Sequence, residues 1–109
     1  MAHTVLTEYF GGHPMLRILE FLIENKIFDY SKKQIAEEVG ISKVTFLKYF
    51  SKLEELGLVK VTRRFGKTKL YTLNESNTFS KRFIELTLSL ANYHAQTIME
   101  KHASVGTRH

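Results

Sequence analysis

The stretch KKQIAEEVGISKVTF, residues 32–46, decides the fold of this chain. Ser31 precedes it and Gln34 lies three residues further on, a spacing at which each side chain satisfies the other's backbone N–H at a helix start. Gly40 suits the end of that helix, because glycine tolerates the left-handed backbone that helix C-termini often need. The pattern predicts one short helix over residues 32–39.

A second helix is expected to follow this glycine after a short turn. Ser42 is a natural N-cap for it, and its apolar periodicity continues to about Leu56. Two helices that meet at a steep angle need a small residue where they cross and a glycine in the turn, and Ala36 and Gly40 fill these roles. Residues 32–56 therefore predict a helix-turn-helix.

The flanking segments extend this pair of helices into a larger domain. Apolar residues at helical spacing predict a helix over residues 14–25. Two runs that alternate in the manner of strands, residues 58–64 and 69–73, surround a turn containing Gly66 and predict a β-hairpin. Helical spacing returns over residues 78–102 and predicts a long final helix.

The positive charge of the chain is concentrated in one block. The 109 residues include 16 Lys and Arg against 11 Asp and Glu, a net charge of +5, and residues 41–75 (the basic block) hold all of this excess. Such a block suggests a polyanionic partner, usually nucleic acid, and the alternative is a solvated charged face. The basic side chains of the block are Lys43, Lys48, Lys52, Lys60, Arg63, Arg64, Lys67 and Lys69.

The composition argues against several other classes of protein. The chain has no cysteine, which excludes disulfides, thiolate metal sites and a cysteine nucleophile. No apolar run of about 18 residues and no signal-peptide layout are present, so we expect no membrane partner and a cytoplasmic, nucleoid-associated protein. The five histidines are too dispersed to favour a metal site, and no nucleophile–base pair or phosphate-binding glycine loop occurs. We therefore expect no cofactor, no metal and no enzymatic activity.

The whole pattern resembles that of winged helix-turn-helix transcription regulators of the MarR and ArsR kind. Residues 41–45 and 53–59 match the recognition helix of these proteins and its passage into the first strand of the wing. The resemblance covers residues 14–75 and, more loosely, the final helix; it is closest to small archaeal winged-helix proteins that end the wing in YTLN, here residues 71–74. It implies a mainly α fold (α+β) with a small β-hairpin wing and a long C-terminal dimerisation helix.

This organisation divides the chain into four parts. We expect residues 1–13 to form an N-terminal segment, helical in part and belonging to a dimer interface, and residues 14–75 to form the winged DNA-binding domain. Residues 76–103 are the expected dimerisation helix, and residues 104–109 a frayed tail. Within the DNA-binding domain, the apolar residues of the connector 26–30 are expected to pack into the core.

Periodicity divides the second helix of the motif into two faces. The apolar stripe from Ile41 to Leu56 is expected inside, and the opposite face in the major groove, where base edges are distinguishable. For Val44 and Leu47, contact with thymine methyl groups and contact within the domain both stay open. The charged hairpin around Gly66 is expected on the DNA backbone or in the minor groove, the alternative being an edge that is merely kept soluble. The expected DNA contacts are Ser42, Lys43, Val44, Thr45, Leu47, Lys48, Ser51, Lys52, Arg63, Arg64, Lys67 and Lys69.

The final helix carries two apolar rows, of which the second runs from Ile84 to Ile98. One row is enough to pack a helix on its own domain, so two rows predict a partner surface, most simply the same helix of a second copy. The alternative is a monomer whose N-terminal segment covers the helix. Which row faces the partner is left open; the first row, at coiled-coil spacing, supplies the expected dimer interface: Phe79, Phe83, Leu86, Leu90 and Tyr93.

Three functions fit these features. The leading one is a sequence-specific double-stranded DNA-binding protein, a dimeric transcriptional regulator whose two recognition helices read an inverted repeat. The second is an architectural or DNA-segregation protein that coats DNA cooperatively with low sequence specificity. The third is a winged-helix protein-interaction module. The residues indicate neither an effector, nor a target sequence, nor the sign of regulation.

Overall fold

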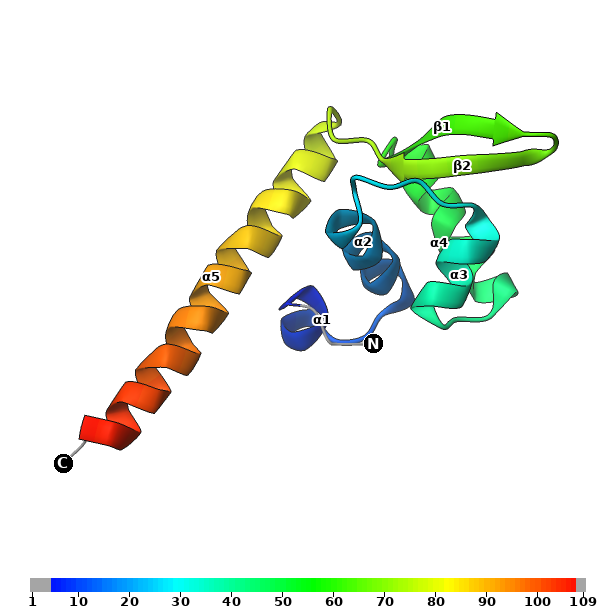
Figure 1. Cartoon of the computed structure of the whole chain (residues 1–109). Coiled ribbons are helices and arrows are strands. Elements are labelled where there is room, and N and C mark those ends of the chain that lie inside the picture. Colours follow the sequence, from blue (N-terminus) through cyan, green and yellow to red (C-terminus); the bar gives the residue numbers. More distant parts are fainter. Residues whose placement is uncertain (1–4, 108–109) are drawn as a thin grey trace.

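Five helices and one two-stranded hairpin make up the part of the chain that the computed structural model describes, the backbone of residues 5–107 and the side chains of residues 6–99. In chain order the elements are α1 (Val5–Phe10), α2 (Pro14–Glu24), α3 (Lys32–Val39), α4 (Lys43–Glu55), β1 (Val59–Phe65), β2 (Thr68–Leu73) and α5 (Thr78–Thr107). Helices α2, α3 and α4 and the hairpin form one body, and α5 leaves it on the side away from the hairpin tip (Figure 1). This architecture confirms the predicted mainly α class with a small β-hairpin.

The ends of α3 and α4 are fixed by the residues that the sequence predicted. The Ser31 hydroxyl accepts the backbone N–H of Gln34 at 3.1 Å, and the Gln34 side chain accepts the N–H of Ser31 at 2.8 Å. Gly40 ends α3 with φ at +77°, the left-handed conformation. Ser42 caps α4 by accepting the N–H of Thr45 at 3.2 Å. The predicted helix-turn-helix is confirmed.

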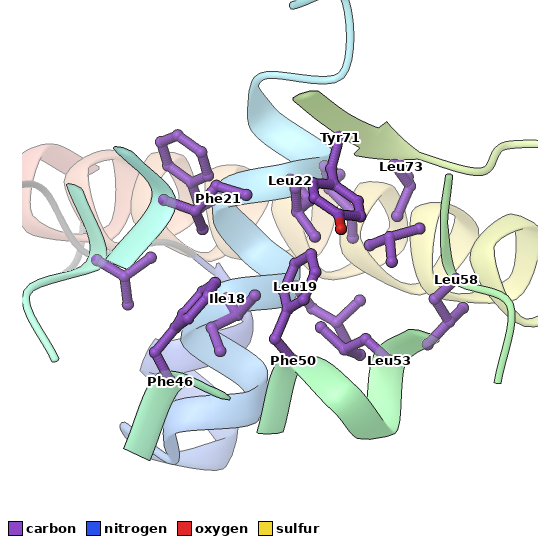
Figure 2. Packing of buried hydrophobic residues seen from close by; sticks show 14 of the residues in the cluster. Ile18, Leu19, Phe21, Leu22, Phe46, Phe50, Leu53, Leu58, Tyr71 and Leu73 are labelled. Atoms are coloured by element: carbon purple, nitrogen blue, oxygen red, sulfur yellow. The ribbon is translucent and has the colours of Figure 1, made fainter. Parts of the chain in front are cut away.

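The inner face of α4 forms the centre of the core. Phe46, Phe50 and Leu53 are at most 1% exposed, and they lie against Ile18 and Leu19 of α2 (Figure 2). Burial of such a side chain stabilises the fold by about 1.5–3 kcal/mol, so this contact holds α4 firmly on α2. The buried apolar set is Leu6, Ile18, Leu19, Phe21, Leu22, Ile23, Ile35, Val39, Phe46, Phe50, Leu53, Leu58, Val59, Tyr71 and Leu73.

The connector between α2 and α3 lies outside the core, and the prediction that its apolar residues pack inside was wrong. Ile27 and Phe28 are 81% and 57% exposed. The backbone of Tyr30 pairs with that of Tyr71 through hydrogen bonds of 2.9 and 2.7 Å, so the connector runs along the edge of the hairpin. It is Tyr30 that reaches the core, where its ring lies 5.0 Å from that of Phe21.

The ends of α4 and α5 also differ from the prediction. Leu56, expected inside, is 43% exposed, because it forms the C-cap of α4 and lies beyond the core. Helix α5 continues through residues 104–107, which were expected to fray, since no proline interrupts its backbone hydrogen bonding there. Residues 108–109 of the predicted tail lie outside the described residues.

The N-terminal segment is helical over α1, as predicted, and this helix packs on α5. Leu6 is fully buried. The Tyr9 ring lies edge-on to that of Tyr93, with centroids 6.4 Å apart, and its hydroxyl lies 3.3 Å from Nδ1 of His94. Residues 1–4 of the predicted segment lie outside the described residues.

An extra residue in β1 changes which side chains share a face of the hairpin. The two strands pair antiparallel, but their register shifts between Val61 and Arg63, with Thr62 as the extra residue of a β-bulge. Val61 pairs with the buried Tyr71, so both lie on the side of the core. Beyond the bulge Arg63 moves to the opposite face, and Arg64 takes the core-side position that strict alternation would give to Arg63.

Replacing Phe50 by alanine tests the role of the α4 inner face. We expect Phe50→Ala to lower the free energy of unfolding by about 3–5 kcal/mol, because a buried ring is lost and a cavity remains. The matched change on the outer face of the same helix, Val44→Ala, is expected to alter it by less than about 0.5 kcal/mol. Denaturant unfolding measures both; equal effects would contradict the assignment of the two faces.

Candidate nucleic-acid interface

The outer face of α4 presents the residues that the sequence predicted. Val44 is 80% exposed and makes no buried contact within the domain. Leu47 is 40% exposed and lines a groove of about 630 Å³ between α3 and α4, next to Ala36 and Phe46. Of the eight predicted contacts on α4 and its cap, Thr45 is half-buried and the others are exposed: Ser42, Lys43, Val44, Leu47, Lys48, Ser51 and Lys52.

The hydroxyl groups of this face are engaged within the helix. The Ser42 hydroxyl accepts the N–H of Thr45 and lies 3.0 Å from the Thr45 hydroxyl. The Ser51 hydroxyl donates to the carbonyl of Lys48 at 2.9 Å. These three side chains therefore hold the backbone of α4 in place, and the charged part of the face comes from its lysines.

Tyr49, on the border between the two faces of α4, contacts one of these lysines. The Lys48 ammonium lies 5.2 Å from the centre of the Tyr49 ring, a cation–π contact. The same half-buried ring also packs edge-on against the ring of His13, with 5.0 Å between the two centroids. His13 is itself fixed, because its Nδ1 accepts the N–H of Met15 at the start of α2. The Lys48 side chain is thus supported by the Tyr49 ring, which is in turn packed against His13.

The wing brings two predicted contacts together without an acidic neighbour. Arg64 pairs directly with Lys69 across the hairpin. Like charges in opposite positions of two strands repel each other, and within the described side chains neither residue has an ion-pair partner. Lys67 is exposed in the turn after Gly66, whose φ of +60° suits a two-residue hairpin turn. The pair and the turn therefore concentrate three cationic side chains near the tip of the hairpin.

Arg63, also a predicted DNA contact, lies on the opposite face of the hairpin and forms an ion pair. Its Nε and Nη2 donate to the two carboxylate oxygens of Asp29, each at 2.9 Å. The Thr62 hydroxyl donates to the same carboxylate. The bonds from Arg63 and Thr62 lower the pKa of Asp29 to about 2. Sequence reasoning missed Asp29, because it precedes its partner by 34 residues and only the bulge aims Arg63 toward it.

The acidic residues of the basic block do not neutralise it. Glu54 pairs with Lys32 at 3.8 Å and Glu75 with Lys26 at 3.9 Å, and both lysines lie outside the block. Among the ion pairs of the described side chains, Arg63 is the one basic residue of the block that takes part. The remaining lysines of the block and Arg64 therefore have no acidic partner among the described side chains.

The two elements that carry these charges, α4 and the hairpin, contact each other. The hairpin tip and the corner between α3 and α4 project in the same direction, while α5 extends the other way (Figure 1). A helix with an exposed basic face beside a basic hairpin matches the two elements with which winged proteins approach duplex DNA: a helix for the major groove and an arm for the backbone or minor groove.

The predicted dimer residues on α5 fall into two groups. Phe83 and Leu90 are half-buried and pack against the chain's own core. Phe79, Leu86 and Tyr93 are exposed by 53%, 38% and 60%. The first apolar row, predicted as one dimer interface, is therefore divided. Two of its residues face the chain's own domain, and the other three face solvent.

Two further observations concern other kinds of site. No helix among the described residues has the length and apolar content needed to cross a membrane. Over the same residues, no group of three or more His, Asp or Glu side chains is placed to hold a metal ion.

The Asp29 carboxyl group provides a titration test of the wing geometry. A carboxyl whose pKa falls from 3.8 to about 2 on folding stabilises the fold above pH 4, and this stabilisation is lost as the pH falls toward 2. We expect a carboxyl NMR titration of Asp29 to have its midpoint near 2 in the native chain and to return toward 3.8 in Arg63→Gln. A native midpoint near 3.8 would contradict the ion pair.

Comparisons with known proteins agree with this geometry. A family model described as winged helix-turn-helix DNA-binding matches residues 15–60, which run from the first turn of α2 to the start of the wing. A comparison with the curated proteins finds no relative.

Solved structures of regulators share the arrangement of helices and wing. MepR, a transcription regulator of the Staphylococcus aureus multidrug efflux pump MepA, is 17% identical, with a TM-score of 0.66 over 88% of this chain and 69% of MepR. MepR in its complex with DNA is also 17% identical, with a TM-score of 0.63 over 94% of this chain and 82% of MepR. The Streptomyces coelicolor regulator PcaV, bound to its natural ligand, is 17% identical, with a TM-score of 0.54 over 87% of this chain and 74% of PcaV. The chain therefore has the winged helix-turn-helix fold of these regulators, and residues 15–60 within it match the DNA-binding family model.

Proposed function

We propose that the chain is a sequence-specific regulator of transcription that binds duplex DNA as a homodimer. The observation that carries the proposal is the Arg64–Lys69 pair, which holds two like charges opposite each other on the wing beside the exposed basic face of α4. Phosphate is the anion that a DNA ligand brings to such a pair. MepR, which shares the fold, is a transcription regulator with a solved DNA complex. Such a protein works on the chromosome, so we place it in the cytoplasm with the nucleoid.

Helix α4 is the element we assign to the major groove. Lys43 and Lys48 carry donors for guanine acceptors or phosphates. Val44 lies between them at the start of the helix and is 80% exposed. An apolar side chain so exposed beside two lysines suits the methyl group of thymine, a contact that distinguishes bases. We therefore assign base readout to Val44 and its lysine neighbours, with Tyr49 as the support of Lys48.

The wing is the element we assign to the DNA backbone. Arg64, Lys67 and Lys69 supply three charges around the hairpin turn, and Arg63 is held away from them by Asp29. Charges that bind phosphates position a protein on the duplex but read no sequence. The wing therefore sets register and affinity, and α4 sets the sequence.

The homodimer rests on the exposed flank of α5. Phe79, Leu86 and Tyr93 follow one another at intervals of seven residues along one side of the helix, and each is exposed. Tyr9 packs beside Tyr93 and Phe10 is 55% exposed, so α1 extends the same apolar surface. A large apolar surface on a projecting helix marks an interaction site. In the proposed homodimer, the same residues of a second copy of the chain cover this surface, because a two-fold contact uses the same surface on both subunits.

Two-fold symmetry predicts the form of the DNA site. Two copies of α4 related by a two-fold axis enter successive major grooves about 34–36 Å apart. The target is then an inverted repeat whose half-sites are separated by about one turn of the duplex.

A matched pair of lysines on the hairpin tests the DNA interface. Lys69→Ala should weaken binding to every DNA sequence and reduce the slope of log affinity against log salt by about 1, because one phosphate contact is lost. Lys60→Ala is the control, since Lys60 pairs with Thr72 on the opposite face of the hairpin. Titrations at several salt concentrations measure both slopes, and an equal change in the two variants would contradict the assigned face.

Two leucines of α5 test the dimer and decide which row meets the partner. We expect Leu86→Glu to raise the dimer dissociation constant by at least about tenfold, because it introduces a charge into a buried contact. Leu88→Glu, in the other row, and Lys33→Glu, on α3, should leave it within about threefold. Sedimentation velocity reports the equilibrium. A monomeric native protein, or a loss of dimer in Leu88→Glu alone, would contradict the proposed interface.

A further inference from the structure

The end of α4 and the start of α5 are joined by the side chains of two asparagines. Nδ2 of Asn77 donates to the carbonyl oxygen of Leu56 at 3.0 Å, and Nδ2 of Asn74 donates to that of Gly57 at 3.1 Å. The backbone N–H of Asn74 adds a bond of 2.8 Å to the carbonyl of Leu58. We call residues 56–58 and 74–80 the junction.

Asn77 binds both helices with one amide group. While its nitrogen bonds the C-cap of α4, its Oδ1 accepts the backbone N–H groups of Phe79 at 2.7 Å and Ser80 at 3.3 Å. The two ends of a side-chain amide lie in one rigid plane, with a donor on one side and an acceptor on the other. The end of the recognition helix and the first turn of α5 are therefore tied to the same planar group.

The junction also has no free space in which to shift. Gly57 has φ at +74°, and a Cβ atom at that position would lie 2.9 Å from Nδ2 of Asn77. Ser80, in the first turn of α5, is fully buried, and none of the described atoms bonds its hydroxyl. A side chain at position 57 would displace the Asn77 amide from its bond to α4, and the buried Ser80 lies in the first turn of α5 beside the junction.

A small change at the junction has a large effect at a distance. Helix α5 has 30 residues and so spans about 45 Å, and turning it by about 10° at its base moves its far end by about 8 Å. That displacement exceeds the rise of two base pairs, about 7 Å. Since the proposed dimer forms along α5, the angle at the junction sets where each α4 lies relative to its two-fold mate.

We infer that Asn77 is the positioning residue that fixes the separation of the two recognition helices, and with it the half-site spacing that the dimer accepts. The inference rests on the proposed function, a dimer that reads an inverted repeat. Asn77 bonds the C-terminal end of α4, whereas Lys43 and Val44, assigned to base readout, lie at its N-terminal end; it therefore selects DNA sites by geometry and touches no base.

The test uses Asn77→Asp, which separates the two roles of the amide. The carboxylate keeps the acceptor that caps α5, because aspartate is a good N-cap, but it has no donor for the Leu56 carbonyl. Asn77→Ser provides a second, uncharged variant that is an N-cap too short to reach α4. Thr78→Asp adds the same charge one residue away, at an exposed position, and serves as the control.

Two measurements report the geometry. Affinity is measured for inverted repeats whose half-site spacing varies one base pair at a time, together with affinity for a single half-site. The chain has no cysteine, so a spin label on Glu55→Cys, at the exposed end of α4, gives the distance between the two recognition helices of the dimer.

We expect the native protein and Thr78→Asp to prefer one spacing by at least about tenfold and to give a narrow distance distribution. Asn77→Asp and Asn77→Ser should lose this preference to within about threefold and broaden the distribution, with half-site affinity unchanged. A sharp native optimum that both Asn77 variants retain overturns the inference and leaves the proposed function intact. A native protein with no preferred spacing overturns both.

Discussion

The burial of Phe46, Phe50 and Leu53 against α2 fixes the rotation of α4 about its own axis, and the DNA interface depends on that rotation. Once these three side chains occupy the core, Val44 and Lys48 on the other side of the helix must face solvent. The core therefore does more than stabilise the fold. It determines which residues of one helix can meet a base edge.

A second constraint acts in the wing, where a single extra residue determines the roles of two neighbouring arginines. The bulge at Thr62 directs Arg63 to Asp29, so this guanidinium holds the wing against the connector. Arg64 is left beside Lys69 without an acidic partner among the described side chains, and the repulsion between them is relieved when an anion binds. The same hairpin thus contains one arginine that holds the structure and one that is free for a ligand.

Features decided by neighbouring residues could be predicted from the sequence, and those decided by distant pairings could not. The capping pair Ser31–Gln34 and Gly40 defined α3 and its turn, because each acts within a few residues. Alternation could not reveal the bulge at Thr62, since an inserted residue leaves the composition of the strand unchanged. The exposure of the connector was equally hidden, because it follows from the backbone pairing of Tyr30 with a strand far along the chain.

We propose that a dimer of this chain reads two half-sites with α4 while its wings hold the DNA backbone. Hydroxyl-radical footprinting on duplexes that the native protein selects from genomic DNA tests it most directly. We expect two short protected patches on one face of the duplex, with centres about one helical turn apart. Continuous protection that spreads along the fragments without regard to sequence would contradict it, and would be typical of a protein that coats DNA.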